Sequence, residues 1–127
     1  MKRESGILLS ISSLPSRYGI GCFSKEAYEF VDQLKQAGQS CWQILPLSFS
    51  TFAGNPYFIS LEDLIEEGVL TRKECDSADF GTHPGAVDYA KIYKERFPLL
   101  RLAYERSNIS QDEEFKQFSA DNKWWLE

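Results

Sequence analysis

A length of 127 residues and a hydrophobic fraction of 43% are compatible with one modest globular domain. The formal net charge is -5, and the 14 basic residues are scattered among 19 acidic ones, which argues against nucleic acid as a partner. Apolar runs fall short of the roughly 18 residues that a membrane helix needs, and three widely spaced cysteines without a signal-peptide core predict a reduced, cytoplasmic setting with no membrane contact.

The first third of the chain predicts a strand, a helix and a second strand. Residues 6–11 form a nearly continuous apolar run, which is typical of a strand buried on both faces. Ser24 is placed to cap a helix with apolar residues at helical spacing, and Gly38 supplies its stop. The short apolar run at residues 41–45 predicts a second buried strand. Two buried strands joined by one helix should be parallel, so the fold class is α/β.

Helices are predicted from residue 61 onward. A short helix is expected over residues 61–67, where Gly68 ends it, and Thr71 is placed to cap another brief helical turn. Residues 79–86 contain two Gly and one Pro, which indicates a linker.

The last third of the chain also has helical spacing. Residues 87–106 predict two helical pieces rather than one, because Pro98 inside a helix costs about 3 kcal/mol. Ser110, with a Glu three residues later, predicts the cap of a final helix with Phe115 and Phe118 facing inward.

These elements divide the chain into two segments. Residues 1–70 are expected to form a first β-α-β portion with its strand-end loops, and residues 71–127 an incomplete, mainly helical segment. Trp124 and Trp125 would expose apolar surface that a complete domain covers, so we expect a continuation after Glu127 and self-association through that surface. Two strands alone also leave their edges unprotected.

No set of side chains predicts a catalytic centre or a metal site. His83 is the only histidine, lacks further ligands at metal-site spacing, and is expected on the surface. Residues 19–21 lack the third glycine of a dinucleotide fingerprint, and no carboxylate pair stands at a predicted strand end. We therefore assign no catalytic residue, no metal ligand and no cofactor. The cysteines are expected to be buried as small apolar residues: Cys22, Cys41 and Cys75.

Three side chains in the loops after the predicted strands are candidates for sugar binding. Tyr18 follows the first strand, and Asn55 and Tyr57 follow the second, at the edge where parallel-sheet enzymes bind ligands. Aromatic rings can stack on sugars, and an amide can donate hydrogen bonds to hydroxyl groups. The alternative is that these residues seal the loops against the core, and for all three both interpretations stay open. For Phe52 the core role is favoured.

A series of short motifs stands in a fixed order along almost the whole chain. In that order they resemble the amino-terminal part of the 4-alpha-glucanotransferases, also called amylomaltases or disproportionating enzymes. The motifs are Gly6-Ile7-Leu8-Leu9, Ser12-Ser13-Leu14-Pro15-Ser16, Tyr18-Gly19-Ile20-Gly21, Ala37-Gly38-Gln39, Trp42-Gln43-Ile44-Leu45-Pro46-Leu47, Phe52-Ala53-Gly54-Asn55-Pro56, Glu67-Gly68-Val69-Leu70, Val87-Asp88-Tyr89 and Trp125-Leu126-Glu127.

The resemblance implies the amino-terminal part of a (β/α)8 TIM barrel, about two barrel strands, followed by a mainly helical segment. It implies transfer of alpha-1,4-glucan segments between maltodextrins by a retaining mechanism that needs no metal or cofactor. The Asp nucleophile, the Glu acid/base and the second Asp of that mechanism belong to later strands, beyond Glu127. The isolated chain is therefore expected to be catalytically inactive, with maltodextrin as its partner.

The chain departs from the family in the loop after the second predicted strand. The family carries roughly a dozen more residues in this strand-end loop, including a Ser-Pro-Tyr-Gln run, whereas here only residues 48–51 separate the two flanking motifs. Two other hypotheses therefore stand beside the enzyme fragment. The chain is a non-catalytic carbohydrate-binding or interaction module, or it is a partial gene product without a stable fold.

Overall fold

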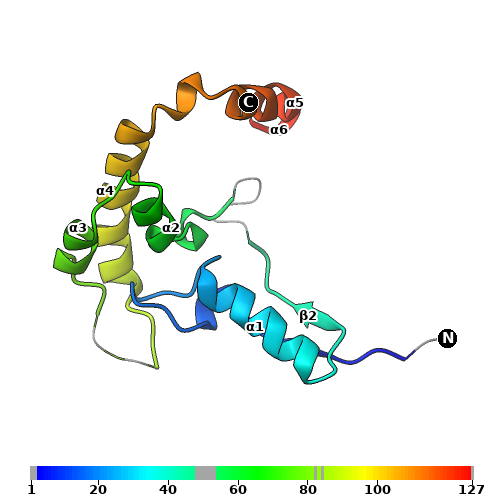
Figure 1. The fold of residues 1–127 in the computed structure, drawn as a ribbon. Helices are drawn as coiled ribbons and strands as arrows, with labels where there is room; N and C mark the ends of the chain where they lie inside the picture. Colours follow the sequence, from blue (N-terminus) through cyan, green and yellow to red (C-terminus); the bar gives the residue numbers. More distant parts are fainter. Residues whose placement is uncertain (1–2, 48–53, 82, 84, 127) are drawn as a thin grey trace.

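The computed structural model describes residues 3–47, 54–81, 83 and 85–126 (Figure 1). Phe52 and the short loop at residues 48–51 lie outside this part. The described elements follow one another as β1 (Gly6–Leu8), η1 (Ile11–Ser13), α1 (Lys25–Gln36), β2 (Cys41–Gln43), η2 (Pro56–Phe58), α2 (Leu61–Glu66), α3 (Arg72–Ser77), α4 (Tyr89–Ser107), η3 (Ile109–Gln111), α5 (Glu113–Asp121) and α6 (Lys123–Leu126). None of the described helices is long and apolar enough to span a membrane.

The strands β1 and β2 form a parallel pair, which confirms the predicted β-α-β unit. Ser24 occupies the predicted N-cap position of α1, but its side chain makes no capping hydrogen bond, because its hydroxyl group donates to the Glu26 carboxylate instead. Gly38 follows the helix with a positive φ of 72°. The strands approach closely at Gly6, where an added Cβ would lie 2.5 Å from the carbonyl oxygen of Cys41. Glycine at these two positions therefore permits the turn after α1 and the close approach of the two strands.

Only one face of this sheet is covered within the described structure. The Trp42 ring meets Phe30 of α1 at a centroid separation of 4.8 Å, so α1 packs on the face that carries Trp42. Residues alternate along a strand, and Leu8 on the other face is 60% exposed. The prediction of strands buried on both faces is wrong, because no other described element covers this second face. For the same reason Cys41 is exposed, against expectation, while Cys22 and Cys75 are buried as predicted.

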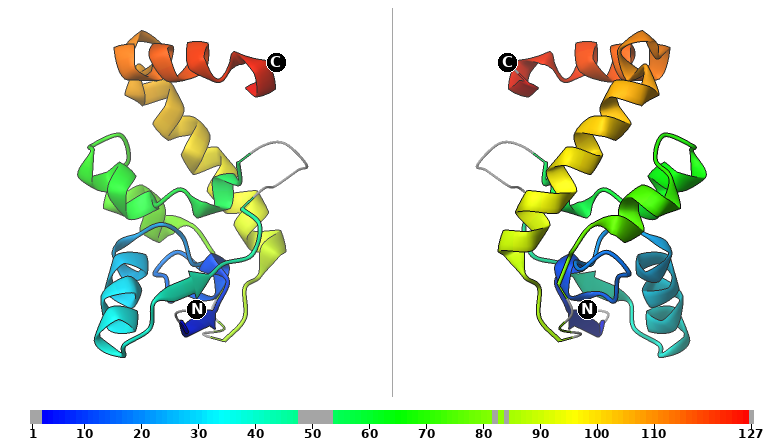
Figure 2. Two further views of the ribbon diagram at one scale, coloured as in Figure 1. Left: turned by 90° about the vertical axis from the view of Figure 1, so that its right-hand side faces the viewer. Right: turned by 90° about the vertical axis from the view of Figure 1, so that its left-hand side faces the viewer.

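The hydrophobic core lies between the loop after β1 and the helices α2, α3 and α4 (Figure 2). Thr71 forms a full capping box with Glu74, which confirms the predicted start of α3. The division of the chain at residue 70 stays a prediction, and one core cluster draws side chains from both sides of it. Its buried members are Tyr18, Ile20, Tyr57, Leu61, Leu70, Cys75, Phe80, Ile92, Leu99 and Ala103.

The helix α4 runs without a break through Pro98, so the prediction of two helical pieces is wrong. Pro98 lies on the exposed side of the helix, whereas Ile92 and Leu99, before and after it, are both buried in the core. Burying side chains of this size stabilises by about 1.5–3 kcal/mol each, which offsets the cost of a mid-helix proline. Tertiary packing therefore overrides the local signal.

The terminal helices differ from expectation in their cap and their burial. Asp112, not Ser110, caps α5, and its side chain accepts a hydrogen bond of 2.8 Å from the Phe115 backbone N–H. Phe115 and Phe118 are exposed rather than inward, because α5 and α6 lie beyond the far end of α4, away from the β1–β2 sheet (Figures 1 and 2). Trp124 is 84% exposed, as the sequence predicts.

Candidate functional site

A pocket of about 560 Å³ opens between the loop that follows β1 and the linker that precedes α4. A volume of this size is typical of small-molecule sites. The lining is mixed: serine hydroxyl groups and glycine backbone alternate with apolar side chains such as Leu14, Ile20 and Val87. The residues whose side chains matter most for a ligand are Ser12, Ser13, Ser16, Arg17, His83 and Tyr89.

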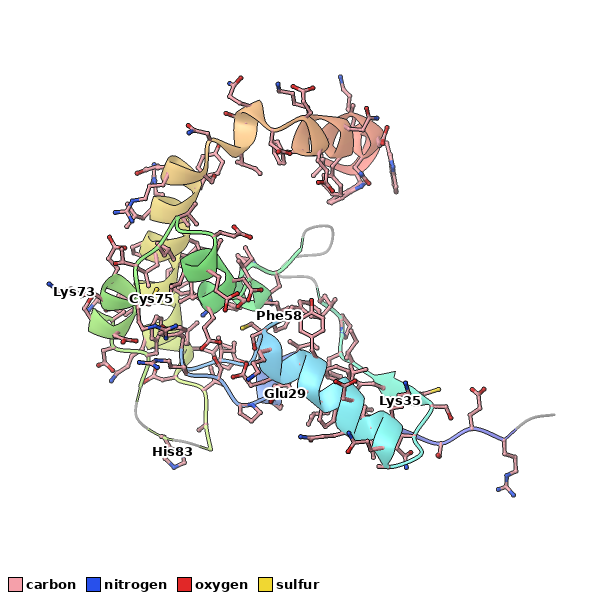
Figure 3. All side chains as sticks on the ribbon, viewed as in Figure 1. Glu29, Lys35, Phe58, Lys73, Cys75 and His83 are labelled. Atoms are coloured by element: carbon pink, nitrogen blue, oxygen red, sulfur yellow. The ribbon has the colours of Figure 1, made fainter. Side chains whose placement is uncertain are left out.

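The two basic side chains of the pocket are Arg17, which pairs with a carboxylate of the protein, and His83, which lies at the surface. Arg17 makes a two-bond ion pair with Asp76, at 3.2 and 2.9 Å, and hydrogen bonding to this carboxylate raises the pKa of Arg17. His83 lies on the exposed linker between α3 and α4 (Figure 3), where its Nδ1 accepts a hydrogen bond from the backbone N–H of Gly85. The surface position predicted for His83 is confirmed. A pocket with its cation already paired favours a neutral, hydroxyl-rich ligand over an anion.

Next to the pocket, four aromatic side chains form a continuous cluster that we call the aromatic surface: Tyr57, Tyr89, Tyr93 and Phe97. Three of them stand four residues apart on α4 and so share one face of the helix. Ring centroids lie 6.3 Å apart for Tyr57 and Tyr89, 5.7 Å for Tyr57 and Phe97, and 5.0 Å for Tyr93 and Phe97. Tyr89 and Tyr93 are 55% and 61% exposed. Because Tyr89 also lines the pocket, the two features are contiguous.

Of the predicted site residues, Tyr57 is the buried member of the aromatic surface and Asn55 lies directly before it in the chain. The Asn55 side-chain oxygen accepts a 3.0 Å hydrogen bond from the Tyr57 backbone N–H and so caps the helical turn η2. This cap fixes the backbone that carries the buried Tyr57 ring. Burial raises the pKa of Tyr57. The structure thus joins these two residues to the exposed rings of α4.

Tyr18, the third predicted site residue, lies apart from them in the core. Its ring is 4% exposed and meets Phe80 edge-on at 5.8 Å. Its hydroxyl group donates a 3.3 Å hydrogen bond to Asp76, and burial raises the pKa of Tyr18. Among the described residues that line the pocket are the chain neighbours of Tyr18, but not Tyr18 itself. A direct contact between Tyr18 and a sugar therefore stays a prediction.

The aromatic rings of α4 are candidate site residues that the sequence alone does not predict. Their signal was present, since Tyr89, Tyr93 and Phe97 follow one another at four-residue spacing, but a single helix pattern does not show which face is left open to solvent. Within the described part of the chain, no three His, Cys, Asp or Glu side chains come together as a metal site. Burial raises the pKa of Glu62, with a smaller contribution from Glu26, but Glu62 lies on α2 rather than at a strand end.

Comparisons with known proteins agree on one group of relatives. The family model described as 4-alpha-glucanotransferase matches residues 9–127. The 4-alpha-glucanotransferase of Streptococcus pneumoniae is 47% identical over 99% of this chain and 27% of its own length, and that of Thermus thermophilus is 38% identical over 100% and 27%.

A solved relative is the amylomaltase from Streptococcus agalactiae in complex with acarbose. It is 37% identical, with a TM-score of 0.85 over 97% of this chain and 28% of its own. The chain thus spans about a quarter of the length of the relatives it matches. The Streptococcus pneumoniae alignment extends over 138 positions against 127 residues in this chain, so the relative carries residues that have no counterpart here.

Proposed function

Because the chain belongs to the 4-alpha-glucanotransferase family, we propose that it supplies the amino-terminal portion of a TIM-barrel enzyme that transfers alpha-1,4-glucan segments between maltodextrins. Within that portion, its role is to bind glucan rather than to cut it. Among the described residues, no pair of carboxylates stands at a strand end for a retaining mechanism, and we expect that the isolated chain does not catalyse transfer. Its two parallel strands are the first strands of the barrel.

The observation that carries this proposal is the continuity of the aromatic surface with the pocket. Exposed rings such as Tyr89 and Tyr93 offer flat apolar faces on which glucose units stack, while Ser12 and Ser13 offer hydroxyl partners in the adjoining pocket. A linear glucan needs this combination of apolar platform and neutral hydrogen-bonding groups. The solved relative was obtained with acarbose, which supports a carbohydrate ligand.

The predicted site residues take different roles in this proposal. Tyr57 positions Tyr89 and Phe97 through ring contacts, and Asn55 holds Tyr57 through its cap. Tyr18 supports the pocket wall from within the core through Asp76 and Phe80. We also propose a reducing, cytoplasmic location, which the three free cysteines support.

The loop after β2 is proposed to be the place where relatives carry their additional residues. The order of the flanking motifs supports this, because only four residues, 48–51, separate the Leu-Pro-Leu and Phe-Ala-Gly-Asn-Pro motifs here. A shorter strand-end loop removes contacts to glucan, so binding should be weaker than in the longer relatives. The aromatic surface then carries a larger share of the binding free energy.

Titration of the chain with maltoheptaose, followed by calorimetry, tests the proposal. Saturable binding is expected, and Tyr93→Ala should weaken it roughly 5- to 30-fold, since one stacking ring contributes on the order of 1–2 kcal/mol. Tyr104→Ala is the matched control, because Tyr104 is an exposed tyrosine of the same helix outside the aromatic surface. Equal effects of the two substitutions, or no binding at millimolar glucan, would contradict the proposal.

A second candidate function, a non-catalytic carbohydrate-binding module, is favoured by the same aromatic surface. A chimera discriminates between the two, in which this chain replaces the matching quarter of the 47% identical relative. Transfer of glucan from maltotriose by the chimera supports the enzyme portion. A folded chimera that binds glucan without transfer supports the module.

A further inference from the structure

A buried thiol and a buried guanidinium meet in the core of the protein. Cys22, on the loop between β1 and α1, is 4% exposed, and Arg96 of α4 is 0% exposed. The Arg96 Nη2 donates a hydrogen bond to the carbonyl oxygen of Ile59, while Nε and Nη1 lack an ordinary partner among the described residues. The side chain that hydrogen-bonds to this cation is the Cys22 thiol. A buried cation is costly to the fold unless an anion compensates it.

The thiol in its neutral form compensates the guanidinium poorly. Burial raises the pKa of the Cys22 thiol, whereas the charge of Arg96 and hydrogen bonds from Ser24 and Arg96 lower it. A neutral thiol is a weak acceptor. An anionic oxygen on the same sulfur would accept charge-assisted hydrogen bonds, which are about twice as strong as bonds between neutral groups. The unpaired donors of Arg96 therefore fit an oxidised form of Cys22 better than the thiol.

We propose that Cys22 is an oxidation site for hydroperoxides and that Arg96 pairs with the sulfinate that forms. In the first step, the Cys22 sulfur attacks one oxygen of hydrogen peroxide. A sulfur–oxygen bond forms and the oxygen–oxygen bond breaks, and the hydroxide that leaves takes up the thiol proton to become water. The sulfur loses two electrons, which the peroxide gains. A second peroxide oxidises the resulting sulfenic acid in the same way to a sulfinic acid, which is an anion at neutral pH.

The other two thiols have surroundings that disfavour an anion. Cys75 is 0% exposed, and burial followed by the charges of Glu74 and Asp76 raises its pKa, while Arg96 acts on it through charge alone. Cys41 is exposed, and its sulfur lies 3.7 Å from the Glu4 carboxylate. Among the three described thiols, Cys22 is thus the one with a cation as its hydrogen-bond partner.

Burial also selects the size of the oxidant. With 4% of Cys22 exposed, local opening of its loop admits a molecule as small as hydrogen peroxide more readily than a bulky disulfide. The oxidised pair would then fix two elements on each other, because Cys22 belongs to the loop after β1 and Arg96 to α4. Oxidation should therefore stabilise the fold. A sulfinate without the guanidinium would be a buried, uncompensated charge and should destabilise it.

Peroxide treatment of the chain tests the site, with Cys41→Ser introduced to remove the exposed thiol. Peptide mass spectrometry should find two added oxygen atoms on Cys22 and an unmodified Cys75. The Tm should rise by about 3–6 °C after oxidation. Arg96→Met should slow the oxidation of Cys22 roughly 10-fold or more, because the thiolate loses its cation, and oxidation should then lower the Tm. Arg101→Met is the matched control, since Arg101 is an exposed arginine of the same helix.

A second pair of variants tests the ion pair without peroxide. Aspartate at position 22 provides a permanent carboxylate in place of the sulfinate, and asparagine provides its neutral counterpart. Cys22→Asp should have a higher Tm than Cys22→Asn, and the order should reverse when Arg96→Met is present as well. An unmodified Cys22, equal oxidation rates with and without Arg96, a lower Tm after oxidation, or Cys22→Asp less stable than Cys22→Asn would each overturn the proposal.

Discussion

The buried guanidinium of Arg96 leads to a specific prediction about stability. Arg96 is 0% exposed, and its Nη2 donates a hydrogen bond to the carbonyl oxygen of Ile59. Its Nε and Nη1 have no hydrogen-bond partner within ordinary distance among the described residues, and the Cys22 thiol, a weak acceptor, is the side chain that interacts with the guanidinium. Burial lowers the pKa of Arg96, and the nearby thiols of Cys22 and Cys75 offset this only in part. The charge therefore costs folding free energy that an apolar side chain would not.

Replacing Arg96 by Met keeps most of the buried volume and removes the charge. Each unpaired buried donor costs about 1–3 kcal/mol, and the lost bond to Ile59 was worth about 1.5–3 kcal/mol. Replacement of buried ionic groups by apolar ones is neutral or stabilising by about 1–4 kcal/mol in other proteins. We expect Arg96→Met to stabilise the chain by about 1–2 kcal/mol.

Urea unfolding followed by circular dichroism measures this change. With a slope of about 2 kcal/mol per molar urea, the midpoint should rise by about 0.5–1 M. Arg96→Ala is the control for packing, and should be about 2–5 kcal/mol less stable than Arg96→Met because it leaves a cavity. A loss of 2 kcal/mol or more in Arg96→Met would refute the reasoning, since it would show that the guanidinium is satisfied in the folded protein.

Three further predictions follow from named contacts. Ile92→Ala, in the core, should lower the free energy of unfolding by about 2–5 kcal/mol in the same urea assay, and a loss below 1 kcal/mol would contradict its burial. Hydrogen bonding to Arg106 lowers the pKa of Glu74 to about 2, so the stabilisation that ionised Glu74 gives the fold is complete above about pH 4.5 and disappears toward pH 2. The Tm difference between the parent chain and Glu74→Gln should therefore shrink as the pH falls from about 4.5 to about 2. A constant Tm difference would contradict the role of this ion pair. Asp112→Ala should cost about 1 kcal/mol in the local stability of α5, seen as faster amide exchange there, and unchanged exchange would rule out the cap.

The elements with strong local signals could be predicted from the sequence. The β-α-β unit follows from short apolar runs around one periodic helix. Thr71 and Gly38 mark helix ends through a capping box and a positive φ, and Ser24 stands at the start of α1 without a side-chain capping bond. The parallel pairing follows from the helical connection between two strands. For the helix ends the decisive atoms lie within a few residues of one another, and for the strand pair one helical connection decides the direction.

The failures concern burial and packing between distant residues. Pro98 is a local signal for a break, but Ile92 and Leu99 bury the helix on both sides of it. The composition of a strand shows that it can be buried, but it does not show which elements cover it. Leu8 is exposed because no other described element covers its face of the sheet. Tyr18 belongs to the core through Asp76 and Phe80, both far along the chain, which sequence spacing does not show.

We expect the aromatic surface to bind glucan, and the aromatic carbon–proton spectrum of the chain reports this binding ring by ring. On titration with maltoheptaose, the ring signals of Tyr57, Tyr89 and Tyr93 should shift in a saturable manner, while those of Tyr28 and Tyr104 stay in place. The maltoheptaose itself should remain unchanged in length. Ring signals that do not move at millimolar maltoheptaose would contradict glucan binding at the aromatic surface. The appearance of longer and shorter maltodextrins would contradict the expectation that the isolated chain does not catalyse transfer.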